Sequence, residues 1–494
     1  MTIRSTYSTL TRALLSAGIL SVAAPAFADD VGDSIANLQG NNEFLINAGN
    51  AIRVTCRGLA SLGTGRTGDQ ATLFGACGDM VNMAFFLDPD NTGGQDRYNP
   101  QGGGAVGVTE YFGLLRQFSG EETSSQSRYA TEGSAGQFKG IASRLSAIRM
   151  GARTSGIAMN LQGMDLIALR DQNQEGPATA LVGGAASNAD ADSGWAWFAT
   201  ADYGFGDRDD SEFENGYDAD SLGFTIGVDY AFGNGWTLGG AYTRSDSEVD
   251  FDRTASGTLN SVSGGDIETE NSSIAGFLNY AGEAFYASAI ISVGEGEYDL
   301  ERSVQVAPST TFAAGFSEDI SSDTDSDQFA AQVQVGYTFG SGATSWDVYG
   351  GYDMLELEID AFEEEGSSPL RLAYGDQDID SEQLFLGATV RRAINTDSGV
   401  LVPYGTIEWR HELDNDARAV DARYALRNEG FTFNGETQNF AIPTDDPDEN
   451  YFEVTLGLSG QLGNNVVVFA QYTAVAGLED TSASVISFGL RGTF

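Results

Sequence analysis

A serine near the start of the chain could act as a nucleophile. Ser34 lies in the tetrapeptide Gly32-Asp33-Ser34-Ile35, and a serine that attacks a carbonyl carbon needs a histidine base within hydrogen-bond reach. The chain contains one histidine, His411, which falls in a segment expected to be a β-strand. Because Asp and Ser also favour the N-cap of a helix, we expect Asp33 or Ser34 to cap the first helix and predict no catalytic site.

Acidic segments of the chain could bind cations. The spacing of Asp88 to Gly93 is that of a calcium-binding loop, but position twelve is Asn99 instead of a bidentate glutamate. We interpret the runs Asp319–Asp327, Glu363–Glu365 and Asp445–Glu449 as solvated faces of outer loops that attract divalent cations only loosely. The sequence therefore predicts no metal site and no cofactor.

The N-terminus has the features of an export signal. Arg4 and Arg12 provide a positive region, residues 13–24 are mostly apolar, and Ala26-Phe27-Ala28 is a small-x-small cleavage pattern. We predict that residues 1–28 form a signal peptide. The alternative, a single uncleaved membrane anchor, is disfavoured because the apolar run is short.

Export decides how the two cysteines are interpreted. An oxidising compartment favours disulfides, and two thiols are too few for a structural zinc site. The sequence therefore predicts a disulfide between Cys56 and Cys77.

The composition excludes a nucleic-acid-binding protein. The chain has 71 acidic and 25 basic residues and a formal net charge of −46, whereas nucleic-acid backbones are bound through basic patches. Aromatic residues make up 11% of the chain, which argues against disorder. After the N-terminus no stretch approaches the roughly 18 apolar residues of a membrane helix, so any membrane span must consist of strands.

Apolar residues recur at helical spacing up to about residue 174, and a polar linker over residues 172–192 follows. Residues 106–118 are apolar without a clear period. We predict a small, mostly α-helical region over residues 29–134, then a longer helix and the linker over residues 135–192. The helical faces carry Ile35, Leu38, Phe44, Leu45 and Ile52; Leu73, Phe74, Cys77, Met80, Val81 and Ala84; and Ile141, Leu145, Ile148, Met159, Leu161 and Leu166.

Beyond residue 193 the apolar period changes from 3.6 to 2, as in residues 222–232, 329–339 and 452–458. A soluble sandwich shows the same alternation, so the connections must discriminate. Short connections such as Gly233-Asn234-Gly235 alternate with long ones such as residues 304–323, which is the pattern of outer-membrane barrels. We predict that residues 193–494 form an all-β transmembrane barrel of about twelve antiparallel strands.

Aromatic, polar and terminal residues fit such a barrel. Aromatic residues flank the short turns, where an interfacial girdle belongs: Phe232, Trp236, Phe285, Phe339 and Trp346. Polar residues on the opposite strand faces would line the bore: Thr225, Asp229, Gln332, Gln334 and Glu453. The final strand carries Phe488, Leu490 and the terminal Phe494 on one side, and we assign these three residues as the signal read by the barrel assembly machinery.

Residues 195–494 resemble the translocator domain of type V autotransporters. The resemblance is carried by Gly194–Trp197, Leu401–Leu413 and Ser487–Phe494, and upstream by Leu115–Glu122 and Ile141–Arg149. It implies a monomeric outer-membrane protein that contacts membrane lipids, is assembled with periplasmic chaperones and the barrel assembly machinery, and translocates or displays its own N-terminal segment with the 137–168 helix in the bore. No enzymatic activity is expected.

The alternative is a passive outer-membrane channel or adhesin barrel whose helical domain stays in the periplasm. The cysteine pair favours this alternative, because a preformed disulfide loop is awkward to pull through a narrow bore. We nevertheless expect residues 29–134 at the cell surface. Self-cleaving autotransporters use an Asn-Asn dipeptide in the lumen helix, whereas the pairs here, Asn41-Asn42 and Asn464-Asn465, lie outside it. We therefore expect the segment to remain covalently attached.

Overall fold

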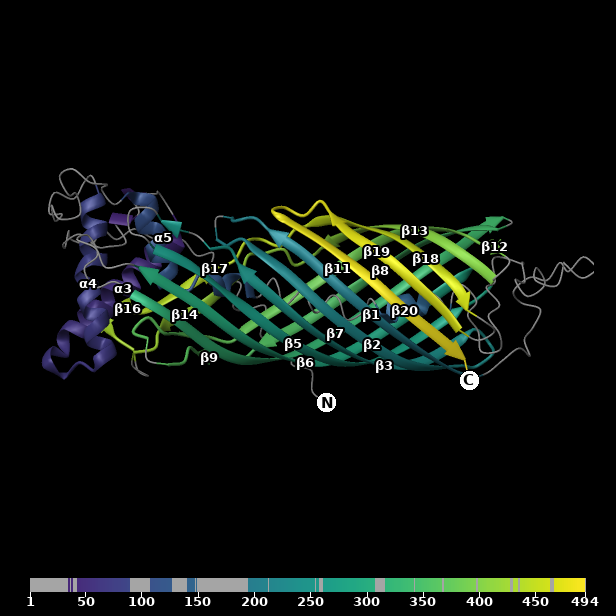
Figure 1. Ribbon diagram of the computed structural model, residues 1–494, viewed down its shortest axis with the longest axis horizontal. Helices are drawn as coiled ribbons and strands as arrows, with labels where there is room; N and C mark the ends of the chain where they lie inside the picture. Colours follow the sequence, from purple (N-terminus) through teal and green to yellow (C-terminus); the bar gives the residue numbers. More distant parts are fainter. Residues whose placement is uncertain are drawn as a thin grey trace, which may run out of the picture.

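A closed barrel of antiparallel strands forms the C-terminal part of the chain (Figure 1). The computed structural model describes residues 34–38, 42–88, 107–126, 140–148 and 194–493, apart from residues 36, 147, 212, 254, 257–260, 307–315, 342, 367, 397–398, 427–429, 434–435 and 463–465. The signal peptide, residues 149–192 and Phe494 therefore lie outside the described residues.

Twelve strands pair with their neighbours, and the ring closes because β1 pairs with β20 and β11 with β13. They are β1 (Gly194–Arg208), β2 (Tyr217–Ala231), β3 (Trp236–Phe251), β5 (Ser261–Ala281), β6 (Phe285–Val306), β7 (Phe316–Ser341), β8 (Thr344–Ile359), β11 (Gln377–Arg392), β13 (Gly399–Glu412), β18 (Asn450–Leu462), β19 (Val466–Ala476) and β20 (Thr481–Thr493). Short strands β4 (Ala255–Ser256) and β12 (Ile394–Thr396) extend this sheet. The prediction of about twelve antiparallel strands is confirmed.

Each barrel strand turns one face outward and the other toward the bore, because side chains alternate along a strand. In β2, Phe224 and Ile226 are 51% and 59% exposed, whereas Thr225 and Asp229 are buried. Gln332 and Gln334 are also buried, as expected for the bore. The aromatic residues beside the short turns are all exposed on the outer face: Phe232, Trp236, Phe285, Phe339 and Trp346.

The two ends of the barrel differ in the length of their connections. The short-turn end carries β12 and the start of β1, and the long-loop end carries a second, four-stranded sheet (Figure 1). This loop sheet has the order β17-β14-β10-β9 and consists of β9 (Phe362–Glu363), β10 (Leu372–Tyr374), β14 (Ala419–Tyr424) and β17 (Asn439–Pro443). A hairpin of β15 (Thr432–Phe433) and β16 (Glu436–Thr437) lies beside α3.

Two sequence predictions about the long loops were wrong. Residues 319–327 lie inside β7 and not in a loop, because the strands continue past the outward apolar belt. The connections over residues 360–377 and 415–448 form the loop sheet, and Glu364 within the Glu363–Glu365 run is buried instead of solvated. A run of charges predicts exposure only when no other segment packs against it.

Helices cover the long-loop end of the barrel (Figure 1). They are α3 (Glu43–Ser61), the 3-10 turn η1 (Gly63–Gly65), α4 (Gly68–Leu87) and α5 (Val108–Phe118), and together we call them the cap. The Asn42 side chain accepts a hydrogen bond from the Leu45 amide at the start of α3, and Thr67 and Gln70 form a capping box on α4. The apolar period of residues 106–118 was unclear from the sequence, and residues 108–118 of this segment form the helix α5.

The apolar side of the cap packs against the loop sheet. Its core joins residues of the helices, such as Leu45, Met80 and Leu115, to Leu372 and Tyr424 of the sheet. The disulfide between Cys56 and Cys77, with a Cα–Cα distance of 5.5 Å, links α3 to α4. Among the described residues, no helix is both long and apolar enough to span a membrane.

Candidate functional site

A short helical segment occupies the bore. Within residues 140–148, which we call the lumen segment, Ile141, Leu145 and Ile148 are buried against aromatic and aliphatic residues of the barrel wall. A Cβ on Gly140 would lie 2.6 Å from Thr200 Oγ1 and 2.7 Å from Thr225 Oγ1. Only glycine allows the backbone to approach the wall this closely.

The lumen segment is bound to the wall by a buried ion pair. Arg144 Nε lies 2.5 Å from Asp229 Oδ2, Arg144 Nη2 lies 2.7 Å from Asp229 Oδ1, and both side chains are at most 3% exposed. Asp229 pairs with Ala196 near the start of β1, whereas Thr200 lies further along that strand. Gly140 thus lies at the level of Thr200, and Arg144 binds a residue that is closer to the short-turn end. From residue 140 to residue 144 the lumen segment therefore runs toward the short-turn end.

The chain between α5 and the lumen segment is held at the long-loop mouth of the barrel. Arg302 of β6 donates two hydrogen bonds to the Glu364 carboxylate, at 2.8 and 2.7 Å, and a third to the Gln117 carbonyl at 2.8 Å. Tyr424 donates to the Phe118 carbonyl at 3.2 Å. A side chain of barrel strand β6 and one of the loop sheet thus bind the end of α5.

Residues 119–126, the mouth segment, follow α5 and are buried throughout. Gly120 has a φ of +64°, a conformation that L side chains rarely adopt. A Cβ at this position would also collide with the Tyr374 hydroxyl. Further along, Gln377 donates a hydrogen bond to Gln126 at 3.1 Å. Backbone shape and side-chain contacts both fix this segment.

Two buried carboxyl groups in the mouth segment have strongly shifted pKa values. Burial raises the pKa of Glu121 to about 8, although Arg116 beside it acts in the opposite direction. Burial raises the pKa of Glu122 to about 7 against the effect of Arg302. In the undocked, solvated segment the pKa of a glutamate is 4.5, so the docked segment keeps its protons to a higher pH than the undocked one. Docking is therefore strongest below pH 4.5 and weakens as the pH rises to about 8.

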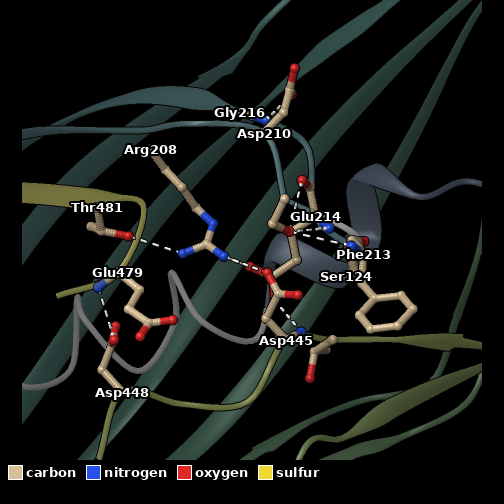
Figure 2. A network of polar contacts seen from close by, with 12 residues as sticks. Ser124, Arg208, Asp210, Phe213, Glu214, Gly216, Asp445, Asp448, Glu479 and Thr481 are labelled. Carbon is tan, nitrogen blue, oxygen red and sulfur yellow. Dashed lines mark hydrogen bonds and ion pairs between the residues drawn. The ribbon is translucent and has the colours of Figure 1, made fainter. Parts of the chain in front are cut away.

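A second polar network joins three loops at the mouth (Figure 2). Arg208 at the end of β1 lies 2.5 Å from Asp445 and 3.2 Å from Glu214, and it donates a hydrogen bond to Thr481. Ser124 of the mouth segment donates to the Phe213 carbonyl in the same cluster, at 3.1 Å (Figure 2). The loops β1–β2, β13–β18 and β19–β20 are therefore tied to one another and to the mouth segment.

Ser34 and His411, the serine and histidine weighed above as a possible catalytic pair, form no contact with each other among the contacts of the described residues. Ser34 is buried beside Ile35, which belongs to the core of the cap, whereas His411 stacks on Trp409 and lies 3.1 Å from Asn450 Oδ1. Apart from Asp88, the suspected calcium loop lies outside the described residues. Within the part of the chain that the structure describes, no group of three or more His, Cys, Asp or Glu side chains is arranged so that it could hold a metal ion.

The residues of the proposed assembly signal lie on the last strand. Phe488 and Leu490 of β20 are 57% and 42% exposed on the outer face, and Phe494 lies outside the described residues. Sequence reasoning found Asp229 but missed Arg144, Arg302 and Glu364. The signal that could have identified Arg144 was the presence of basic residues, Lys139, Arg144, Arg149 and Arg153, on the otherwise apolar 137–168 helix.

The geometry defines a class of protein: an outer-membrane barrel with a helical segment in its bore and helices on its long-loop end. The model of the family "Autotransporter beta-domain" matches residues 197–473, which is more than half of the chain. The chain belongs to this family. It is accordingly an outer-membrane β-barrel of the type V secretion class.

Curated relatives match only part of the chain. Outer membrane protein A of Rickettsia rickettsii is 26% identical over 212 residues, covering 42% of this chain and 9% of the relative. Esterase EstA of Pseudomonas aeruginosa is 26% identical over 217 residues, covering 42% of this chain and 30% of the relative. The chain thus spans less than a third of the length of these relatives.

Solved translocator domains are similar at low identity. The translocator domain of autotransporter NalP from Neisseria meningitidis has a TM-score of 0.46 and 16% identity, covering 67% of this chain and 93% of that chain. The beta domain of the Bordetella autotransporter BrkA has a TM-score of 0.40 and 17% identity, covering 61% of this chain and all of that chain.

Proposed function

We propose that this barrel displays its own N-terminal region, residues 29–134, on the outer face of the outer membrane and keeps it covalently attached. One observation carries the proposal: the cap packs on the long-loop end of the barrel, while β1 begins at the short-turn end. Long loops face the outside in barrels of this kind. The chain leads from the cap at the long-loop end, through the lumen segment in the bore, to the start of β1 at the short-turn end. With this path, the N-terminal region has passed through the barrel to the outer face of the membrane.

In this proposal the protein is monomeric and has no enzymatic activity. Its partners are outer-membrane lipids, periplasmic chaperones and the barrel assembly machinery, which reads Phe488, Leu490 and Phe494. The relative named as an esterase lends no support to hydrolysis here, because Ser34 has no histidine base: His411 lies on β13 beside Trp409.

An epitope inserted in η1 tests surface display. Gly63–Gly65 is exposed, and nothing lies within 4 Å of a Cβ on Gly63 or Gly65, so an insertion there should not disturb the cap. We expect protease treatment of intact cells to remove the epitope. A matched epitope in the short β2–β3 turn, near Asn234, should be cleaved only after lysis. Protection of the η1 epitope in intact cells would refute display.

Attachment is tested in the same cells. We expect an antibody against the η1 epitope and one against the barrel to detect a single band of full mature length. A separate barrel fragment that starts near residue 170 in untreated cells would refute covalent attachment.

The alternative is a passive channel or adhesin barrel with a periplasmic helical domain. Planar-bilayer conductance of the full chain and of a chain lacking residues 29–170 separates the two functions. Display with a lumen segment predicts a large pore only after the deletion. Equal large conductance of both chains would favour the passive barrel.

A further inference from the structure

We propose that the bore retains a cation-selective passage for small ions, between the lumen segment and the wall formed by β11, β13, β18 and β19. This inference goes beyond display, because it concerns what crosses the barrel while the lumen segment is in place. It rests on two cavities, on the charges that line them, and on one cluster where they meet.

The first cavity, of about 270 Å³, lies toward the long-loop mouth and is lined by the ends of β1, β2, β11 and β13 together with the loop at residues 444–448. The second, of about 260 Å³, lies deeper, between Ala142, Ser143 and Ser146 of the lumen segment and the opposite wall. Each is far larger than the roughly 10–15 Å³ that one water molecule requires. Polar side chains make up part of the lining of each cavity, so both can hold water.

The two cavities meet within the bore. Ser381, Gln383, Tyr451 and Glu453 line both of them. The first cavity reaches the mouth beside Asp445, and the second extends to Arg491, which pairs with Val467, the second residue of β19. Together they follow the bore from the mouth toward the short-turn end.

Acidic residues far outnumber basic ones in the lining of the first cavity. They include Asp202, Asp380, Glu412 and Asp414, and the one arginine among its described lining residues is Arg418. A narrow passage with an excess of fixed negative charge concentrates cations and excludes anions. The charge of the mouth therefore favours cations.

A charged cluster stands where the cavities meet. Arg410 lies 2.8 Å from Asp353, 2.7 Å from Glu408 and 3.4 Å from Glu453. Its guanidinium also donates to Gln383 Oε1 at 2.9 Å. One guanidinium among three carboxylates leaves a net negative charge beside the junction, where Arg410 lines the second cavity and Glu453 lines both.

The inner end of the passage carries an arginine of a different kind. Arg491 is 6% exposed, its hydrogen bond to Ser459 Oγ is 3.4 Å long, and its Nε has no hydrogen-bond partner. Among the described residues no carboxylate forms an ion pair with it. This uncompensated charge opposes the passage of cations and limits the current.

Reversal potentials of the full chain in planar bilayers test the proposal. In a KCl gradient we expect a small, steady conductance that is several-fold selective for K⁺ over Cl⁻. Arg410→Gln should raise the current at least twofold and increase the selectivity for K⁺ over Cl⁻. Arg491→Gln should raise the current. Glu453→Gln should reduce the selectivity for K⁺ over Cl⁻. The matched control is Arg244→Gln, which removes the same charge from an exposed pair on the outer face and should change neither value.

A full chain that carries no current, or one selective for Cl⁻, would overturn the passage. So would an Arg244→Gln variant that shifts the reversal potential as much as Arg410→Gln, because surface charge would then explain the selectivity. Failure of display would show instead in protection of the η1 epitope, which leaves the conductance unaffected.

Cysteine labelling supplies a test that does not depend on removing charge. Cys56 and Cys77 are bonded to each other, so Ser381→Cys would provide a free thiol at the junction with little change in size. We expect a trimethylammonium methanethiosulfonate reagent to block most of the current of this variant. The control, Ser303→Cys on the outer face of β6, should react without any block. An unblocked Ser381→Cys channel that is shown to be labelled would refute the passage.

Discussion

Replacing Asp229 with asparagine tests whether charge holds the lumen segment in the bore. The change keeps the size of the side chain and removes the negative charge that faces Arg144 through two hydrogen bonds. Both side chains are almost inaccessible to solvent. The guanidinium would therefore remain buried without a counter-charge, while it would be fully hydrated if the segment left the bore.

The cost can be worked out from this burial. Removing one partner of a buried ion pair costs about 3–5 kcal/mol, and asparagine still accepts one hydrogen bond, so we expect the lower end of that range. A change of about 3 kcal/mol corresponds to roughly a 100-fold shift in the equilibrium between the docked and undocked states. Arg491 also faces the bore and carries the same positive charge as Arg144. It therefore adds to the free-energy cost of keeping Arg144 buried without a counter-charge.

Single-channel recording measures this shift. Undocking of the lumen segment should open the whole bore, so Asp229→Asn should raise the fraction of time spent in large openings by about two orders of magnitude. The charge swap Asp229→Arg with Arg144→Asp should restore much of the closed state. Asp218→Asn, an exposed change on the same strand, is the control. An Asp229→Asn barrel that stays as closed as the native chain would refute the reasoning.

Three further predictions concern the cap. Replacing Cys56 and Cys77 with serine should destabilise the cap by about 3 kcal/mol and speed its digestion on intact cells; an unchanged digestion rate would mean that the cap does not depend on the disulfide. Gly120→Ala should cost at least about 1–2 kcal/mol because of its positive φ and should release the cap, which would be measured as easier cleavage after α5. Raising the pH from 4.5 to 8 should weaken docking of the mouth segment by a few kcal/mol, on the order expected for pKa values raised to about 8 and 7. Glutamine at both Glu121 and Glu122 should make the digestion rate independent of pH, and a pH dependence that survives the double change would contradict this assignment.

The barrel could be predicted from sequence because its strands separate two solvents. Lipid on one side and a polar bore on the other impose a strict alternation, so the period alone assigns Phe224 and Ile226 outward and Thr225 and Asp229 inward. The turn lengths then orient the barrel. The helices α3 and α4 of the cap could be predicted because their apolar residues follow a period of 3.6, whereas α5 falls in the segment without a clear period.

The contacts that hold the mouth segment could not be predicted in this way. Periodicity states which face a residue occupies and not which residue it meets. Glu364 lies in an acidic run that looked solvated, yet it binds Arg302, which lies 62 positions away in the chain. The loop sheet was missed for a related reason, because strands such as β10 are three residues long and carry no readable alternation.

The positions of the ion pairs explain why a passage can exist on one side of the bore. Arg144 binds Asp229 of β2 near the short-turn end, and Gly140 brings the lumen segment against β1 and β2 at the level of Thr200. The segment is thus drawn toward one wall along its described length. The opposite wall, where Arg410 and Glu453 lie, keeps its polar side chains in contact with water. A barrel wide enough to let a helix pass, but holding that helix by one side, necessarily leaves space along the other, and the charges on that free wall determine which ions can use it.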